Sequence, residues 1–288
     1  MTALRQRMID DLRVRNYSER TIEAYVSAVA RFAKHFGQPP DQLGPDQIHA
    51  FQCHLLERQC SWSQFNQIVC GLRFFFNITL GRPEMVKHLP FGKRPKKLPV
   101  VLSPEEVRQL LDAATGRDRM LLQVAYACGL RVGELIRLQV SDIDSSRMVI
   151  HVRQGKGKKD RLVPLSQRLL QELRQYWLQT RPKTWLFPAP RGDGHLGSAW
   201  VQKLCKRLVR QTKLNKAATP HTLRHSYATH LVEAGVDLMT LQKILGHRSL
   251  TTTTLYVHLS TRHLRQAPSL LDLLVVPKAA QEKAEEAT

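Results

Sequence analysis

"ATPHTLRHSYATHLVEAG", residues 218–235, has the signals of one complete helix, with a marked start and a marked end. Thr219 suits the N-cap, a proline follows at the first helical position, and Gly235 suits the C-terminal end. His221 and Arg224 then share the face of the first turn. An imidazole and a guanidinium at the positive end of a helix dipole favour an anion there. The alternative, a capping histidine that binds nothing, leaves this unfavourable placement of cations unexplained.

A second apolar helix follows and ends at a glycine. The stretch "VDLMTLQKILGH", residues 236–247, stops at Gly246 and so places His247 just beyond the helix C-terminus. Tyr256 comes nine positions later, among threonines and leucines. Such a tyrosine is usually a packing residue, because a phenol with a pKa near ~10 is a poor nucleophile without a nearby base or positive charge. Its role therefore depends on cations elsewhere in the chain.

Two earlier stretches supply such cations. "YACGLRVGELIRL", residues 126–138, sets Arg131 after a glycine and Glu134 one turn later. This spacing is usual for a surface ion pair, but the carboxylate could also orient the guanidinium so that it grips two oxygens of one phosphate. "RMVIHVRQGKGKKDRLVPL", residues 147–165, has two β-rich runs around a glycine- and lysine-rich turn. This pattern predicts a hairpin whose cationic tip carries Lys156 between two glycines.

The chain is strongly basic. Its 288 residues include 44 Lys and Arg against 24 Asp and Glu, a formal net charge of +20 with a pI near 10.2. This balance favours a polyanionic partner, with nucleic acid first and an anionic membrane surface second. No run of about eighteen apolar residues occurs, and the start "MTALRQRMIDDLRVR" lacks the apolar core of a signal peptide. We therefore expect a soluble, cytoplasmic protein without a membrane partner.

Five scattered cysteines, an odd number without a C-x-x-C pair, indicate reduced thiols in a cytoplasm. A zinc site from Cys53, His54, Cys60 and Cys70 is conceivable, but their spacing fits no common zinc pattern. The cysteines are more typical of small core residues. We expect neither a metal ion nor a cofactor.

Helical periodicity divides the chain into two parts. "YSERTIEAYVSAVARFAKHF", residues 17–36, repeats apolar residues at helix spacing, and residues 1–82 predict an all-helical domain. Residues 81–99 carry four prolines, two glycines and a basic run, which predicts a linker at residues 83–99 that is either simply solvated or lies along a phosphate backbone. Residues 100–275 predict a second, mostly helical domain that contains the hairpin, and residues 276–288 predict a disordered tail. The expected fold is mainly α with a small β-hairpin or sheet, in two domains.

Six motifs now stand in order along the chain: "YSERTIEAY", "GLRVGEL", "GKGKKDRLVPL", "HTLRHSYATHL", "LGH" and the tyrosine that follows it. Together they resemble the tyrosine recombinase, or phage integrase, family, most closely its short bacterial Xer-like members. The resemblance covers nearly the whole chain and implies a helical DNA core-binding domain followed by a catalytic domain. It also implies the catalytic residues: Arg131 and Arg224 as the two arginines, Lys156 as the hairpin lysine, His221 and His247 as the two histidines, and Tyr256 as the nucleophile.

By this resemblance the protein is a site-specific recombinase or integrase that cuts and rejoins double-stranded DNA through a 3′-phosphotyrosyl bond, without ATP or metal, as a tetramer on two duplexes. Lys156 suits protonation of the leaving 5′-oxygen, His221 acid–base catalysis at Tyr256, and His247 a hydrogen bond to the phosphate. The apolar residues 268–276 would pack either into a neighbouring subunit or on their own domain. Two rivals are a type IB topoisomerase and a non-catalytic DNA-binding regulator, which would have no use for a nucleophile.

Overall fold

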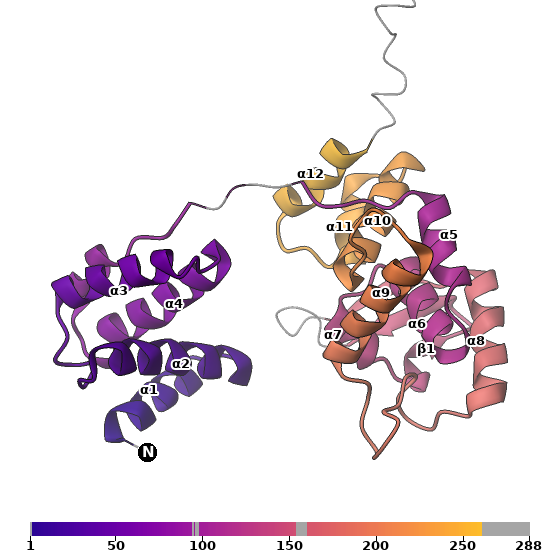
Figure 1. Cartoon of the computed structure of the whole chain (residues 1–288). Helices are drawn as coiled ribbons and strands as arrows, with labels where there is room; N and C mark the ends of the chain where they lie inside the picture. The colour runs from indigo at the N-terminus through magenta and orange to yellow at the C-terminus, as the bar shows by residue number, and fades with distance from the viewer. Residues whose placement is uncertain (1, 94, 96–97, 154–159, 261–288) are drawn as a thin grey trace, which may run out of the picture. The chain divides into compact units, whose positions relative to one another are not determined.

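The computed structural model describes residues 2–93, 95, 98–153 and 160–260. It divides into two compact units, an N-terminal unit, Met1–Lys97, and a C-terminal unit, Leu98–Thr288 (Figure 1). Both are built mainly from helices, and the C-terminal unit adds a small sheet, which confirms the predicted fold class. No helix in the described part of the chain is long and apolar enough to cross a membrane.

Helices alone build the N-terminal unit. They are α1 (Ala3–Val14), α2 (Glu19–Phe36), α3 (Pro45–Glu57), α4 (Trp62–Phe74), the π-helical turn η1 (Phe75–Thr79) and the 3-10 helix η2 (Pro83–His88). Ser18 caps α2 by accepting the Thr21 N–H, and the apolar stripe of α2 predicted by its periodicity is buried down to Phe32. That stripe packs against α4 to form the core of the unit.

The N-terminal unit continues beyond the residue at which the sequence predicts a linker. Met85 and Leu89 are buried in its core, at 7% and 0% exposure. The Arg73 guanidinium donates to the Leu89 carbonyl (2.9 Å), and Asn66 exchanges two hydrogen bonds with the backbone of Gly92 (2.8 and 3.0 Å). Residues 83–92 therefore pack on the N-terminal unit, because apolar anchors lie between the basic residues.

Helices and a three-stranded antiparallel sheet build the C-terminal unit. Its elements are α5 (Pro104–Asp112), α6 (Gly116–Ala127), α7 (Val132–Ile136), η3 (Val140–Asp142), β1 (Ile143–Asp144), β2 (Val149–Val152), β3 (Arg161–Pro164), α8 (Gln167–Thr180), α9 (Ser198–Thr212), α10 (Pro220–Glu233), α11 (Leu238–Leu245) and α12 (Leu250–Leu259). Strands β2 and β3 form the predicted hairpin, with Ile150 opposite Val163, and β1 adds a short third strand. The tip of this hairpin, which carries Lys156, lies outside the described residues.

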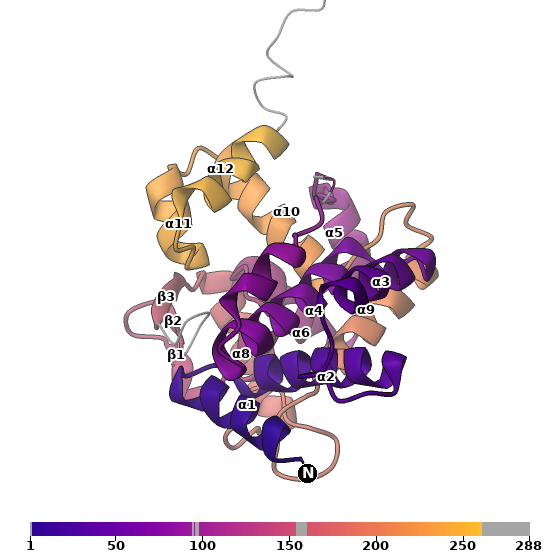
Figure 2. The same cartoon turned by 90° about the vertical axis from the view of Figure 1, so that its left-hand side faces the viewer.

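Helices α10, α11 and α12 lie side by side at one end of the C-terminal unit (Figures 1 and 2). Thr219 caps α10 as the sequence predicts, accepting the Thr222 N–H at 3.1 Å. Gly246 ends α11 in the left-handed region, at φ +62°, which a residue with a Cβ adopts only at a cost. This turn directs the chain from α11 into α12, so that Tyr256 packs into the small core between the three helices.

Candidate active site

Arg224, near the start of α10, hydrogen-bonds to the backbone of two turns that lie elsewhere in the sequence. Its side chain is buried, and Nη1 donates to the Gly129 carbonyl (2.6 Å) while Nη2 donates to the Leu245 carbonyl (2.6 Å). Burial and the charge of Arg131 lower the pKa of Arg224 to about 10, which leaves the guanidinium charged at neutral pH. The sequence predicted that cationic side chains would favour a bound anion at this helix end. The structure shows the Arg224 guanidinium there, buried and held by two backbone carbonyls.

Glu134 is buried and shared between arginines. Arg161 donates to both of its oxygens (2.9 and 2.8 Å), and Arg131 donates from its side chain and its backbone N–H (both 2.8 Å). Burial favours the protonated acid, but the hydrogen bonds and charge of Arg161 and the hydrogen bonds of Arg131 outweigh it, so the pKa of Glu134 falls to about 2. The pair predicted from sequence as either a surface ion pair or an oriented guanidinium is therefore buried, with only 2% of the Glu134 side chain exposed.

Positive charge dominates this cluster. Arg224 lies 3.9 Å from Glu134, so three guanidiniums, those of Arg131, Arg161 and Arg224, surround one carboxylate among the residues that the structure describes. Arg131 Nη2 also reaches the Gly246 carbonyl at 3.4 Å, which joins α7 to the end of α11. An anion such as a phosphodiester would balance the excess charge.

Tyr256 lies beside this cluster and is 2% exposed. Its ring stacks on His247, with centroids 6.1 Å apart and planes at 13°. Burial raises the pKa of Tyr256, although the charges of Arg224 and Arg131 and a hydrogen bond from Arg224 act in the opposite direction. The phenol is therefore protonated at neutral pH and needs a base or a bound substrate to become a nucleophile.

His247 follows the α11 cap, as the sequence predicts, and is held by both ring nitrogens. Nε2 lies 3.2 Å from Arg224 Nη2, and Nδ1 lies 3.0 Å from the Thr253 hydroxyl. Burial and the charges of Arg224 and Arg131 lower the pKa of His247 to about 4. The imidazole is therefore neutral at physiological pH.

Two of the three α10 histidines, His221 and His225, lie near the cluster and occupy different positions. His221 is exposed on the first turn, whereas the ring of His225 lies beside Tyr256, with centroids 5.7 Å apart. His225 Nδ1 is buried without a hydrogen-bond partner among the described residues. Burial, with the charges of His221 and Arg224, lowers the pKa of His225. Arg131, Arg224, His247 and Tyr256 are thus brought together, His221 lies at the edge of the group, and Lys156 lies outside the described residues.

Arg161, Thr253 and His225 belong to the cluster, although the sequence interpretation did not name them as site residues. A signal for Arg161 exists in the sequence: strand periodicity puts it on the same face as Val163, which is fully buried. A charged residue on the buried face of a strand needs a partner, here Glu134. No comparable local signal marks Thr253, one of four consecutive threonines.

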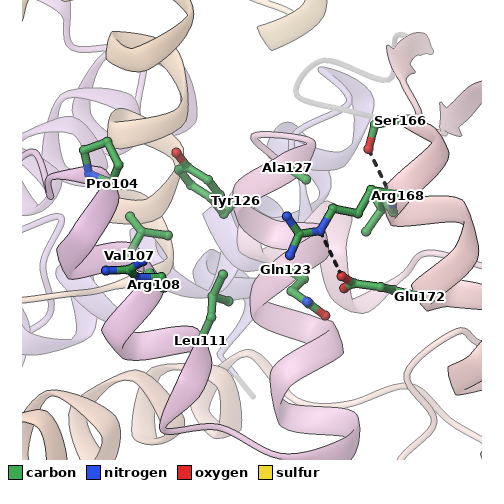
Figure 3. A pocket seen from close by; sticks show the side chains of 11 residues that line it. Pro104, Val107, Arg108, Leu111, Gln123, Tyr126, Ala127, Ser166, Arg168 and Glu172 are labelled. Carbon is green, nitrogen blue, oxygen red and sulfur yellow. Dashed lines mark hydrogen bonds and ion pairs between the residues drawn. The ribbon is translucent and has the colours of Figure 1, made fainter.

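A pocket of about 370 Å³ lies elsewhere in the C-terminal unit, between α5, α6 and α8 (Figure 3). Val107, Leu111 and Tyr126 line it, and the Arg168–Glu172 ion pair lies at its edge. It contains none of the clustered arginines and histidines. The candidate active site is therefore a cluster of fixed side chains and not this pocket.

Among the described residues, no group of three or more His, Cys, Asp or Glu side chains could hold a metal ion. Cys53, His54, Cys60 and Cys70, the zinc ligands considered from sequence, are among the residues described and form no such group. The five cysteines are free thiols, and Cys128 and Cys205 are buried.

Comparison with known proteins matches both units to one family. Residues 100–263 match the phage integrase family, and residues 4–84 match its N-terminal SAM-like domain. The chain is 44% identical over 280 residues to the putative integrase/recombinase y4qK of Sinorhizobium fredii (strain NBRC 101917 / NGR234), covering 96% of this chain and 91% of that protein. It is 34% identical over 261 residues to the tyrosine recombinase XerA of Pyrococcus horikoshii, covering 89% of each.

The fold agrees with these relatives. The crystal structure of the XerH site-specific recombinase bound to its palindromic difH substrate, a post-cleavage complex, superposes with a TM-score of 0.70 at 22% identity and covers 90% of this chain and 82% of that one. Family and fold matches of this extent agree with the order of the motifs along the chain. The protein therefore belongs to the phage integrase family and is a tyrosine-type site-specific recombinase of the short Xer-like kind.

Proposed function

We propose that this recombinase breaks DNA strands with Tyr256 and holds the scissile phosphate among Arg131, Arg224 and His247. The observation that carries the proposal is the buried Tyr256 ring, stacked on His247 beside three guanidiniums that share one carboxylate. Tyr256 would attack the phosphorus in line, form a 3′-phosphotyrosyl bond and release a 5′-hydroxyl. Attack by a second strand's hydroxyl would reverse the step, so the bond energy is kept and no ATP is needed.

The arginines would stabilise the charge that develops on the phosphate. Arg131 and Arg224 are already oriented, by Glu134 and by the carbonyls of Gly129 and Leu245, so little reorganisation is needed when a phosphodiester binds. Arg161 would act indirectly, by fixing Glu134. These guanidiniums can neutralise the equatorial oxygens, a function that a metal ion performs in other phosphoryl transferases.

Proton transfer would involve Lys156 and His221. Lys156, on the hairpin, would protonate the leaving 5′-oxygen, because an alkoxide is a poor leaving group. His221 would accept the Tyr256 proton during cleavage and return it during rejoining. Its exposed position at the start of α10 leaves it free to meet a substrate at that helix end.

The partner would be double-stranded DNA carrying specific sites, bound by both units in the cytoplasm. A net charge of +20 supports such a partner. Recombination of two duplexes would need four protomers, with the segment from residue 266 onward, outside the described residues, contributing to assembly. The similarity to a putative integrase supports movement of a DNA element as the biological use.

The test is a suicide-substrate assay in EDTA. Nicked duplexes with candidate sites are incubated with the wild type, Tyr256→Phe and Tyr227→Phe, and then run on SDS gels. Tyr227 is the matched control, since it lies in the same small core and is 8% exposed. We expect a covalent adduct with the wild type and Tyr227→Phe and none with Tyr256→Phe. An adduct that persists in Tyr256→Phe would exclude Tyr256 as the nucleophile, and salt-sensitive binding with no adduct in any variant would favour a regulator.

A further inference from the structure

The hydrogen bonds of His247 define which nitrogen carries its proton. An arginine can only donate, so Nε2 must accept from Arg224 Nη2 at 3.2 Å. With a pKa of about 4 the ring is neutral and has one N–H, which is then on Nδ1. That N–H donates to the Thr253 hydroxyl oxygen at 3.0 Å. In the DNA-free protein His247 is therefore the Nδ1–H tautomer.

Thr253 accepts the N–H of this tautomer. It lies on α12, three residues before Tyr256, and is 0% exposed, so water cannot replace its hydroxyl. A hydroxyl can accept from an N–H or donate to a bare ring nitrogen by rotating its hydrogen. Thr253 can therefore satisfy Nδ1 in either protonation pattern of the neutral ring.

The proposed function requires the other pattern. When a phosphodiester binds, its anionic oxygens compete for Arg224, because a charge-assisted hydrogen bond is stronger than one to a neutral imidazole. Nε2 of His247 then loses its donor, and the ring can contact a phosphate oxygen only as Nε2–H. The proton would leave Nδ1 and another would be taken up at Nε2 by exchange with solvent, with no net change. Nδ1 then needs a donor, and the Thr253 hydroxyl lies at the required distance.

We propose that Thr253 is a positioning residue that lets His247 change from the Nδ1–H tautomer, which accepts from Arg224, to the Nε2–H tautomer, which donates to the scissile phosphate. The inference rests on the proposed function for its substrate and on the geometry of the DNA-free protein for its first state. Thr253 does not touch the phosphate and acts only through the imidazole.

The first arm of the test reads the tautomer directly. Full-length protein with ¹⁵N-labelled histidine is measured by long-range ¹H–¹⁵N correlation, and the His247 signals are assigned by their absence in His247→Gln. We expect Nδ1–H in the free wild type and Nε2–H with saturating inorganic phosphate. Thr253→Val should keep Nδ1–H when free, because Arg224 still donates to Nε2, but should not reach Nε2–H with phosphate, because Nδ1 then has no donor. Thr253→Ser should behave as wild type, and Thr252→Val, an exposed neighbour on the same helix, should change nothing. Shifts in Thr253→Val identical to wild type in both states would overturn the proposal.

The second arm measures cleavage of the suicide substrate. Thr253→Val should slow adduct formation at least about tenfold, with DNA affinity within about threefold of wild type, and Thr253→Ser should restore the rate. An unaltered rate in Thr253→Val refutes the positioning role and leaves the proposed function standing. No adduct with the wild type refutes the proposed function, and the tautomer measurement, which needs no cleavage, still decides whether Thr253 fixes the ring.

Discussion

Glu134 holds the arginine cluster together. Its carboxylate is 2% exposed, and the side chains of Arg161 and Arg224 around it are 8% and 4% exposed. Glu134→Gln keeps the shape but leaves these buried guanidiniums without a counter-charge, which should cost about 3 kcal/mol of unfolding free energy. Urea unfolding monitored by tryptophan fluorescence measures this loss of unfolding free energy, since three of the four tryptophans lie in the C-terminal unit. The control is Glu172→Gln: its partner Arg168 is 86% exposed, so the loss should stay within about 0.5 kcal/mol. Equal losses in the two variants would refute this role.

His247 should make stability depend on pH in the mildly acidic range. Its pKa is lowered from 6.5 to about 4, so the unfolded chain takes up a proton first as the pH falls. This stability is fully present above pH 6.5 and is lost as the pH falls through 6.5 towards 4. Between pH 7.5 and 5, the free energy of unfolding measured in urea titrations should fall by roughly 1–2 kcal/mol less in His247→Gln than in the wild type. His258→Gln, exposed on α12, should keep the wild-type dependence, and a His247→Gln curve parallel to wild type would exclude the effect.

Individual site residues could be selected from the sequence where few other residues of the same type stand in a comparable local context. Arginine beside glycine, histidine after a helix cap and a lone tyrosine are recognisable in the sequence, and the structure brings Arg131, Arg224, His247 and Tyr256 into one cluster. Their catalytic roles, like those of His221 and Lys156, stay predictions. Thr253 could not be selected among its threonine neighbours, since only burial and the distance to His247 distinguish it.

At the level of elements, the turn between α6 and α7 depends on a glycine. Gly129 has φ +56°, and a Cβ there would lie 2.3 Å from the Tyr227 ring on α10. The same residue's carbonyl accepts from Arg224, so the turn sets how close α10 can approach. Gly129→Ala should therefore combine a left-handed backbone cost of about 1–2 kcal/mol with overpacking of about 1–3 kcal/mol.

The matched control is Gly116→Ala at the start of α6. Gly116 has a similar φ of +51°, but no atom lies within 4 Å of the added Cβ, so only the backbone cost of about 1–2 kcal/mol applies. Urea midpoints of the two variants give the difference, which is the contribution of the packing against Tyr227. A smaller loss for Gly129→Ala than for Gly116→Ala would show that α10 adjusts freely.

At the level of the whole molecule, each of the two units has its own buried apolar residues, in one cluster in the N-terminal unit and two in the C-terminal unit among the described residues. We expect residues 1–97 and residues 98–288, expressed alone, each to unfold cooperatively in urea, because each buries its own apolar residues. A fragment ending at residue 82, where the sequence places the linker, should be less stable than 1–97 by about 3 kcal/mol or more. It lacks Met85 and Leu89, and burying each such side chain is worth about 1.5–3 kcal/mol. Equal midpoints for 1–82 and 1–97 would restore the boundary at residue 82.

Helices, hairpin, two-domain fold class and family could all be predicted from the amino-acid sequence. Capping and hydrophobic periodicity act over a few neighbouring residues. The N-cap at Thr219, the helix end at Gly246 and the apolar stripe of α2 could therefore be predicted from the sequence. Three contacts could be found only in the folded chain: Arg161 shares Glu134, the His225 ring lies beside Tyr256, and Thr253 supports His247. Such contacts join residues far apart in the sequence, 27 positions for Glu134 and Arg161 and 95 for Gly129 and Arg224, and depend on how α7, β3 and α10 to α12 pack. Packing at that range is set by the summed fit of all the elements and by no local pattern.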